Sequence, residues 1–182
     1  MKKVIALTLS VLMIAAILVG CGTNSAKKSN PLTDLNGELS TIMDTLYKTY
    51  EGFPTEFAPA TMPAEMVTAD EYSIKYFTGL DNASKIKDVL VSEPMTGSQP
   101  YSVVLVRVND VADAKSVAEG MFNGIDQRKW FCVEADVLRV VAVNDLVLLV
   151  MIGSTMTDLS VDTMVETFGK VCDQKFDVDL KK

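Results

Sequence analysis

Residues 137–152 read VLRVVAVNDLVLLVMI, and this stretch decides the fold. Its two halves, residues 137–143 and 146–152, have the length and the apolar, β-branched composition of buried strands. Asn144 and Asp145 between them predict a tight turn, although the pair lacks the glycine of the strongest hairpin signal. The stretch therefore predicts an antiparallel hairpin.

A second hairpin is predicted upstream of the first. Residues 101–108 (YSVVLVRV) form another apolar run, residues 86–95 contain a further strand, and TGSQP at 96–100 supplies turn chemistry between them. Apolar residues at helical spacing follow each hairpin, over residues 110–125 and from Ser160 onward. This order predicts an α+β domain with a mainly antiparallel four-stranded sheet, built from two strand–strand–helix units in a pseudo-twofold arrangement.

An extra helix is predicted on the N-terminal side of the sheet. Apolar residues keep helical spacing over residues 35–50, and Asp34 before them is a suitable N-cap. Gly52 and Pro54 end the helix. We therefore expect residues 34–182 to form a single α+β domain.

The predicted strands are too apolar for a sheet that is covered on one face only. Strands of such a sheet alternate apolar and polar side chains, but residues 146–152 show no alternation and residues 101–108 are interrupted only at Ser102 and Arg107. Two explanations stay open. Either the first helix and the proline-rich residues 53–66 cover the second face, or part of that face is a ligand groove, a dimer interface or a partner site.

The first 20 residues have the pattern of an export signal. Lys2 and Lys3 precede an apolar run at residues 4–19, which spans about 24 Å as a helix and is shorter than the membrane core of about 30 Å. A cleaved signal peptide therefore fits better than a permanent membrane helix. The run ends in LVGC at residues 18–21, which resembles the lipobox of bacterial lipoproteins. That resemblance implies cleavage after residue 20 and diacylglyceryl modification of Cys21.

The residues after the lipobox predict a tether. Residues 22–33 (GTNSAKKSNPLT) are small and polar and include a proline, so we expect residues 21–33 to be a lipidated cysteine followed by a flexible segment. Two acyl chains make a stable anchor where one would be marginal. We therefore predict a lipid-anchored protein on the extracytoplasmic face of the cell membrane. An ordinary secretory signal with a chance cysteine is the alternative.

The charge of the chain limits its partners. The net charge is −7, and removal of residues 1–20 leaves 15 Lys and Arg against 24 Asp and Glu, a net charge of −9. An acidic protein lacks the basic surface that nucleic acid requires, so we expect no nucleic-acid partner. Wide contact with anionic lipid head groups is disfavoured for the same reason, which leaves the membrane contact to the anchor on Cys21.

The composition removes much of the usual catalytic chemistry. The chain contains no His, which excludes Ser-His-Asp and Cys-His nucleophile systems and His metal ligands. The ten Gly are scattered and form no phosphate-binding loop. We therefore expect no cofactor, no metal site and no catalytic residue. Two of the 24 acidic residues could still converge as in a glycan hydrolase, although solvation of the surface explains them more simply.

Arg128, Lys129 and Trp130 form the most distinctive cluster of polar and aromatic residues. A tryptophan that stacks beside two cations suits an anionic or glycan ligand, so these three are the candidate ligand-binding residues. In the structural alternative, Trp130 covers the core and the stems of the two cations lie across its rim. Besides Cys21, the thiols are Cys132 and Cys172. They are either two buried apolar residues or, because an exported protein can be oxidised, a disulfide.

Three segments carry a resemblance to a known family. Residues 93–95 (EPM), 101–108 (YSVVLVRV) and especially 128–133 (RKWFCV) resemble lipoproteins of Gram-positive anaerobes that are grouped as domain of unknown function 4358. The resemblance runs from about Leu35 to the C-terminus, with Phe131 standing where the pattern has an aliphatic residue. It implies lipoprotein character and a Gram-positive surface, but no activity, ligand or catalytic residue.

These observations predict a non-enzymatic binding or interaction module, with an envelope protein or a glycan as its partner. Two other functions stay open. One is a cell-wall glycan hydrolase that uses paired carboxylates. The other is a small-ligand carrier that uses an apolar face of the sheet.

Overall fold

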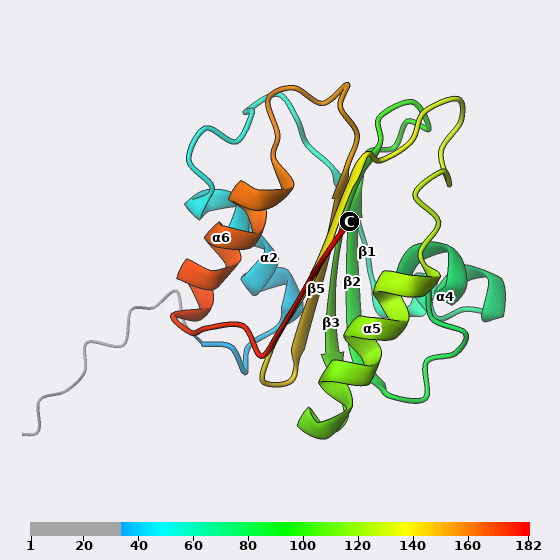
Figure 1. Ribbon diagram of the computed structural model, residues 1–182, viewed down its shortest axis with the longest axis vertical. Helices are drawn as coiled ribbons and strands as arrows, with labels where there is room; N and C mark the ends of the chain where they lie inside the picture. The colour runs from blue at the N-terminus through cyan, green and yellow to red at the C-terminus, as the bar shows by residue number, and fades with distance from the viewer. Residues whose placement is uncertain (1–33) are drawn as a thin grey trace, which may run out of the picture. The chain divides into compact units, whose positions relative to one another are not determined.

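The computed structural model describes residues 34–182 (Figure 1). Six antiparallel strands form one sheet in the order β1-β2-β3-β5-β4-β6. The strands are β1 (Ala60–Met62), β2 (Ile86–Glu93), β3 (Tyr101–Val108), β4 (Val137–Val143), β5 (Leu146–Ile152) and β6 (Val178–Lys181). The signal peptide, Cys21 and the tether predicted above lie outside the described residues. Within residues 34–182, no helix is long and apolar enough to cross a membrane.

The prediction of four strands is wrong, because the sheet has two more strands at its edges. β1 pairs with β2, and β6 pairs with β4. These edge strands are three and four residues long, which is too short for a clear periodic signal in the sequence. They are specified mainly by the backbone hydrogen bonds of the strands beside them.

Both predicted hairpins are present, but their helices break the expected pseudo-twofold symmetry. β2 pairs with β3, β4 pairs with β5, and β3 joins β5 at the centre of the sheet. A twofold axis between β3 and β5 would place the helix after each hairpin on the same face. Instead α5 (Ala114–Gly124) and α6 (Val161–Cys172) lie on opposite faces (Figure 1).

Helices cover both faces of the sheet, which explains the continuous apolar strands. α6 and the first helix, α2 (Leu39–Thr49), lie on one face, while α5, α4 (Glu71–Thr78) and α3 (Ala64–Val67) lie on the other (Figure 1). Successive residues of β3 and β5 contribute to the two cores in alternation and are essentially inaccessible to solvent. The first explanation offered above is therefore confirmed for the first helix. Among the described residues, the strands leave no open apolar sheet face for a small-ligand carrier.

The first helix begins four residues later than predicted, because Asp34 closes a turn instead of capping the helix. Its carboxylate accepts from the backbone N–H of Asn36 and its carbonyl accepts from that of Gly37. Arg107, at the end of β3, donates to the carbonyls of Leu35 and Gly37, each at 2.8 Å. Because these two carbonyls already accept hydrogen bonds from the buried guanidinium, they do not need the backbone N–H groups of a helix as donors. The chain therefore enters the domain at the end of the sheet where β3 stops.

A pair of tyrosines, half-buried Tyr47 and fully buried Tyr101, joins α2 to the sheet. The Tyr101 hydroxyl donates to the Tyr47 hydroxyl at 3.0 Å, which in turn donates to Ser92 Oγ at 2.7 Å. Burial raises the pKa of Tyr47 to about 12, although its bonds to Ser92 and Tyr101 oppose the shift. The folded protein therefore keeps this hydroxyl protonated at a pH at which an unfolded chain ionises it.

We expect Tyr47 to stabilise the fold below pH 10 and to lose that contribution as the pH rises toward 12. The pKa is 10.0 in the unfolded chain and about 12 in the folded protein, so the unfolded state binds fewer protons in this window and stability falls with pH. The native protein should therefore lose about 2 kcal/mol of its free energy of unfolding, relative to Tyr47→Phe, between pH 10 and pH 12. Urea unfolding at a series of pH values measures the difference, and a constant difference would contradict the assignment.

Candidate functional site

The candidate ligand-binding residues lie on a braced loop, residues 125–136, between α5 and β4. Gln127 closes the neck of this loop: its side-chain amide donates to the Ala135 carbonyl at 2.8 Å and its own carbonyl accepts from the Ala135 N–H at 2.9 Å. Further out, the Arg128 guanidinium donates to the Glu134 carboxylate at 2.7 Å. These three bonds fix the loop without any regular secondary structure.

Lys129 anchors the loop in the interior. Its ammonium group forms an ion pair with the Glu93 carboxylate at the end of β2, and the side chains of Lys129 and Glu93 are only 2% and 7% exposed. The same carboxylate oxygen accepts from Ser102 Oγ at 2.6 Å. The rings of Tyr76, Phe77 and Trp130 surround the ammonium group, with centroids 4.9, 5.5 and 5.4 Å from Nζ. Burial lowers the pKa of Lys129, while the charge of Glu93 opposes that shift.

The three candidate residues therefore differ in their exposure and in their roles. Lys129 points into the protein, so it is a structural residue and is not accessible to a ligand. Trp130 is half-buried and packs against the core under α5. Arg128 stays exposed beside Glu134. The structural alternative given above, in which Trp130 covers the core, therefore holds in part. Arg128 and one side of Trp130 remain at the surface.

A hollow of about 490 Å³ opens beside these two residues. Its walls come from the braced loop and from the start of the β5–α6 loop. The lining residues are Arg128, Trp130, Cys132, Val133, Glu134, Asp136, Ser154 and Thr155. The Asp136 carboxylate accepts from the backbone N–H of Ser154, which lowers its pKa. This bond ties the two loops together and keeps a negative charge in the hollow.

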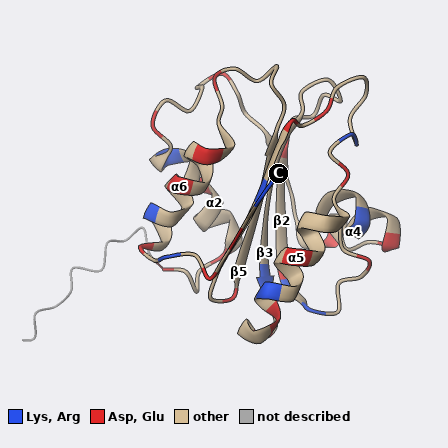
Figure 2. Ribbon diagram, in the orientation of Figure 1, with Lys and Arg blue, Asp and Glu red and all other residues tan. Residues whose placement is uncertain are grey.

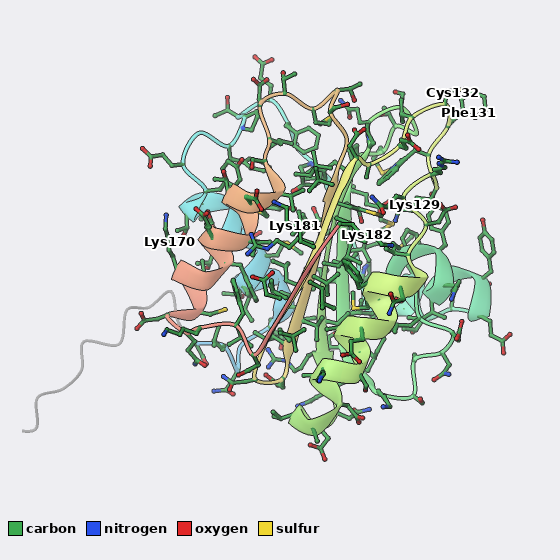
Figure 3. The ribbon with its side chains drawn as sticks, in the orientation of Figure 1. Lys129, Phe131, Cys132, Lys170, Lys181 and Lys182 are labelled. Atoms are coloured by element: carbon green, nitrogen blue, oxygen red, sulfur yellow. The ribbon has the colours of Figure 1, made fainter. Side chains whose placement is uncertain are left out.

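Two large apolar side chains project into solvent from loops at the same end of the sheet as the hollow. Phe131, at the tip of the braced loop, is 81% exposed, and Met95, in the β2–β3 loop, is 86% exposed. The two loops are joined where the Phe131 N–H donates to the Gly97 carbonyl at 2.9 Å. Figure 3 shows Phe131 and Cys132 pointing away from the domain, while Lys129 lies back toward the sheet. The loop therefore holds an apolar side chain in solvent on a rigid support.

The alternative of a Cys132–Cys172 disulfide is contradicted, because both thiols are free. Cys172 is buried at the end of α6, and burial raises its pKa to about 12. Cys132 is exposed on the braced loop, on the opposite side of the molecule from Lys170 in the last turn of α6 (Figure 3). The expectation of a buried apolar cysteine is therefore correct for Cys172 and wrong for Cys132.

Four acidic residues among residues 34–182 are poorly suited to act as a general acid. A general acid needs a raised carboxyl pKa, but the pKa values of Asp70, Asp136, Asp162 and Asp179 are all lowered, because backbone N–H groups or cations donate to them. Asp162 and Asp179 belong to a surface network with Arg139 and Lys181. In this part of the chain no group of three acidic or cysteine side chains is placed to hold a metal ion.

Four loops meet at the end of the sheet that carries the hollow, and they are acidic. The strand register brings together residues 50–59, 94–100, 125–136 and 153–160, which we call the loop end. Six exposed acidic residues lie there, and the only basic residues are Arg128 and Lys129, each already bound to a carboxylate. In Figure 2 these loops carry several red segments and little blue. The acidic residues are Glu51, Glu56, Asp126, Glu134, Asp136 and Asp158.

Comparisons of the chain with protein-family models, with curated proteins and with solved structures find no match.

Sequence reasoning missed two parts of this site. Glu93, the buried partner of Lys129, and Ser102, which donates to the same Glu93 carboxylate, are 36 and 27 residues away from Lys129 in the sequence, and nothing in a single sequence pairs them. The polar Ser102 inside an otherwise apolar strand was the available signal. Exposure of Phe131 was also missed, because a phenylalanine in a sequence is more often part of a core.

Proposed function

We propose that the protein is a non-enzymatic binding module, held at the extracytoplasmic face of the cell membrane by lipid on Cys21, and that it presents the loop end to an envelope partner. The observation that carries the proposal is the position of the loop end. The chain enters the domain beside Arg107, where β3 stops, whereas Phe131 and the hollow lie where β3 starts. Along the eight residues of β3, the two ends of the sheet are about 24 Å apart.

This separation supports display away from the membrane. The tether predicted for residues 21–33 has 13 residues; a flexible chain of that length would have a root-mean-square length of about 20 Å and would keep the tethered end of the domain close to the lipid anchor. The loop end then faces the space beyond the membrane, where it meets other envelope components. The resemblance of residues 93–95, 101–108 and 128–133 to a family of Gram-positive lipoproteins supports the same location, and we propose that the chain belongs to that family.

The anchor is tested by replacing the modified sulfur. In Cys21→Ser, we expect the protein to leave the membrane fraction or to keep its signal peptide, because a serine cannot carry the thioether-linked diacylglyceryl group that permits cleavage. Fractionation of the native host, with mass spectrometry of the N-terminal peptide, measures both. The matched control is Cys132→Ser, which alters an exposed thiol of the domain and should leave membrane retention unchanged. Tight retention of a correctly cleaved Cys21→Ser protein would refute the anchor.

A further inference from the structure

We propose that the loop end binds a basic polypeptide segment, with a cationic side chain of the partner in the hollow beside Trp130 and an apolar side chain against Phe131 and Met95. This inference rests on the proposed function, because it names the chemistry of the partner that the displayed loops would meet. The charge of the loop end, the lining of the hollow and the exposed apolar residues of the loop end support it.

The charge of the loop end selects a cationic partner. Residues 34–182 hold all 24 acidic residues and 13 of the 17 basic ones, a net charge of −11. At the loop end both basic side chains are neutralised, Arg128 by Glu134 and Lys129 by Glu93. Neither of them pairs with Glu51, Glu56 or Asp158, the exposed acidic residues of the other loops. Such a surface attracts a basic segment and repels anionic lipid and other acidic proteins.

The hollow provides a place for one cationic side chain. Asp136 keeps its negative charge there because the Ser154 N–H stabilises the carboxylate. Glu134 on the same wall is already paired with Arg128, so Asp136 is the unpaired carboxylate of the hollow, and Trp130 contributes an aromatic surface. An ammonium or guanidinium group beside a carboxylate and an indole gains both ionic and cation–π attraction. A neutral sugar could use the indole and the carboxylate of the hollow but would gain nothing from the acidic surface around it, and that surface would repel an anionic ligand.

The apolar rim adds a second requirement. Phe131 and Met95 are the two most exposed large apolar side chains of the described residues, and both belong to loops that meet through the Phe131–Gly97 hydrogen bond. Exposed aromatic and methionine side chains on a rigid support are typical of the buried centre of a protein interface. The partner segment should therefore combine Lys or Arg with an aromatic or aliphatic residue.

Binding of defined peptides to the full chain in nonionic detergent micelles tests the surface. The probe is GKWKGKWKG, and the controls are GEWEGEWEG, GKGKGKGKG and micelles without protein. The Glu134→Gln/Asp136→Asn variant keeps its hydrogen-bond acceptors but loses two charges, and we expect at least about tenfold weaker binding of the probe. The matched control, Asp44→Asn/Asp173→Asn, removes two exposed charges away from the loop end and should change the affinity less than about twofold.

The peptide results decide between specific and general attraction. The proposal is supported if the Lys-Trp peptide binds most tightly of the three peptides. Its affinity should also fall in Glu134→Gln/Asp136→Asn and in Phe131→Ala but not in the control double variant. Equal losses in both double variants, equal binding of the peptide without Trp, or no binding would overturn it. If Cys21 proves to be unmodified in the native host, the proposed function fails, while the peptide titration still judges the loop end separately.

A photo-crosslinking residue at position 131 tests the same surface in intact envelopes. We expect adducts with basic segments of an envelope protein, as identified by mass spectrometry, and their loss in Glu134→Gln/Asp136→Asn but not in Asp44→Asn/Asp173→Asn. Adducts with lipid, with glycan or with a second copy of the chain would overturn the proposal. So would adducts with acidic segments, or the absence of any adduct in material that is lipidated on Cys21.

Discussion

Lys129→Met is expected to destabilise the protein by about 3–5 kcal/mol, the largest effect of any single charge removal in the domain. The substitution leaves the Glu93 carboxylate buried with Ser102 as its remaining donor. An uncompensated charge in a site of low polarity is far more costly than the loss of an exposed ion pair. Urea unfolding of the native and variant proteins at neutral pH measures the change in the free energy of unfolding.

The adjacent cation supplies the control for this result. Arg128 also binds a carboxylate, but its side chain is 79% exposed, so Arg128→Met should cost less than about 1 kcal/mol. The double variant Lys129→Met/Glu93→Gln removes the buried negative charge as well. Its loss in the free energy of unfolding should be smaller than the summed losses of Lys129→Met and Glu93→Gln. A loss below about 1 kcal/mol for Lys129→Met would show that the pair does not anchor the loop.

Phe168→Ala is expected to lower the free energy of unfolding by about 3–5 kcal/mol. Phe168 is completely buried on α6 in the core between that helix and the sheet, and its ring stacks on Phe176 with centroids 6.4 Å apart. Truncation removes a large apolar side chain from contact and leaves a cavity that the surrounding strands cannot fill. Chemical denaturation with a single cooperative transition gives the value directly.

Phe131→Ala is the matched control, because it removes the same side chain from a position that is 81% exposed. We expect its effect on stability to stay within about 0.5 kcal/mol. Equal losses for the two variants would mean that Phe131 is buried in the folded protein, and the apolar rim of the loop end would then not exist.

The prediction of the central sheet succeeded because its signal is local. The continuous apolar runs in β3 and β5 require cover on both faces, and helices on both faces supply it. α6 begins directly after Ser160, next to its predicted start, and the Ser160 hydroxyl caps it by accepting from the Thr163 N–H; α4 stops at Gly79, whose positive φ suits a glycine. Asp34 failed as a cap because a distant residue, Arg107, bonds the carbonyls of the first turn.

The candidate site was predicted by its residue types but not by their roles. Arg128 and Trp130 line the hollow, but Lys129 between them is buried. Neighbours in an irregular segment point in different directions, and only packing decides which of them is buried. Lys129 entered the core because Glu93 and three aromatic rings were placed there by β2, α4 and the loop itself. The same anchoring left Phe131 in solvent.

The sequence by itself determined the four central strands, the principal helices and the acidic balance of the chain, since periodicity is a property of neighbouring residues and net charge is a property of their sum. Only the tertiary structure decided the edge strands, the opposite placement of α5 and α6, and the gathering of four acidic loops at the end of the sheet away from Arg107. These features depend on contacts between segments that are far apart in the chain. The free energy of such contacts comes from burial and pairing, and no local pattern encodes it.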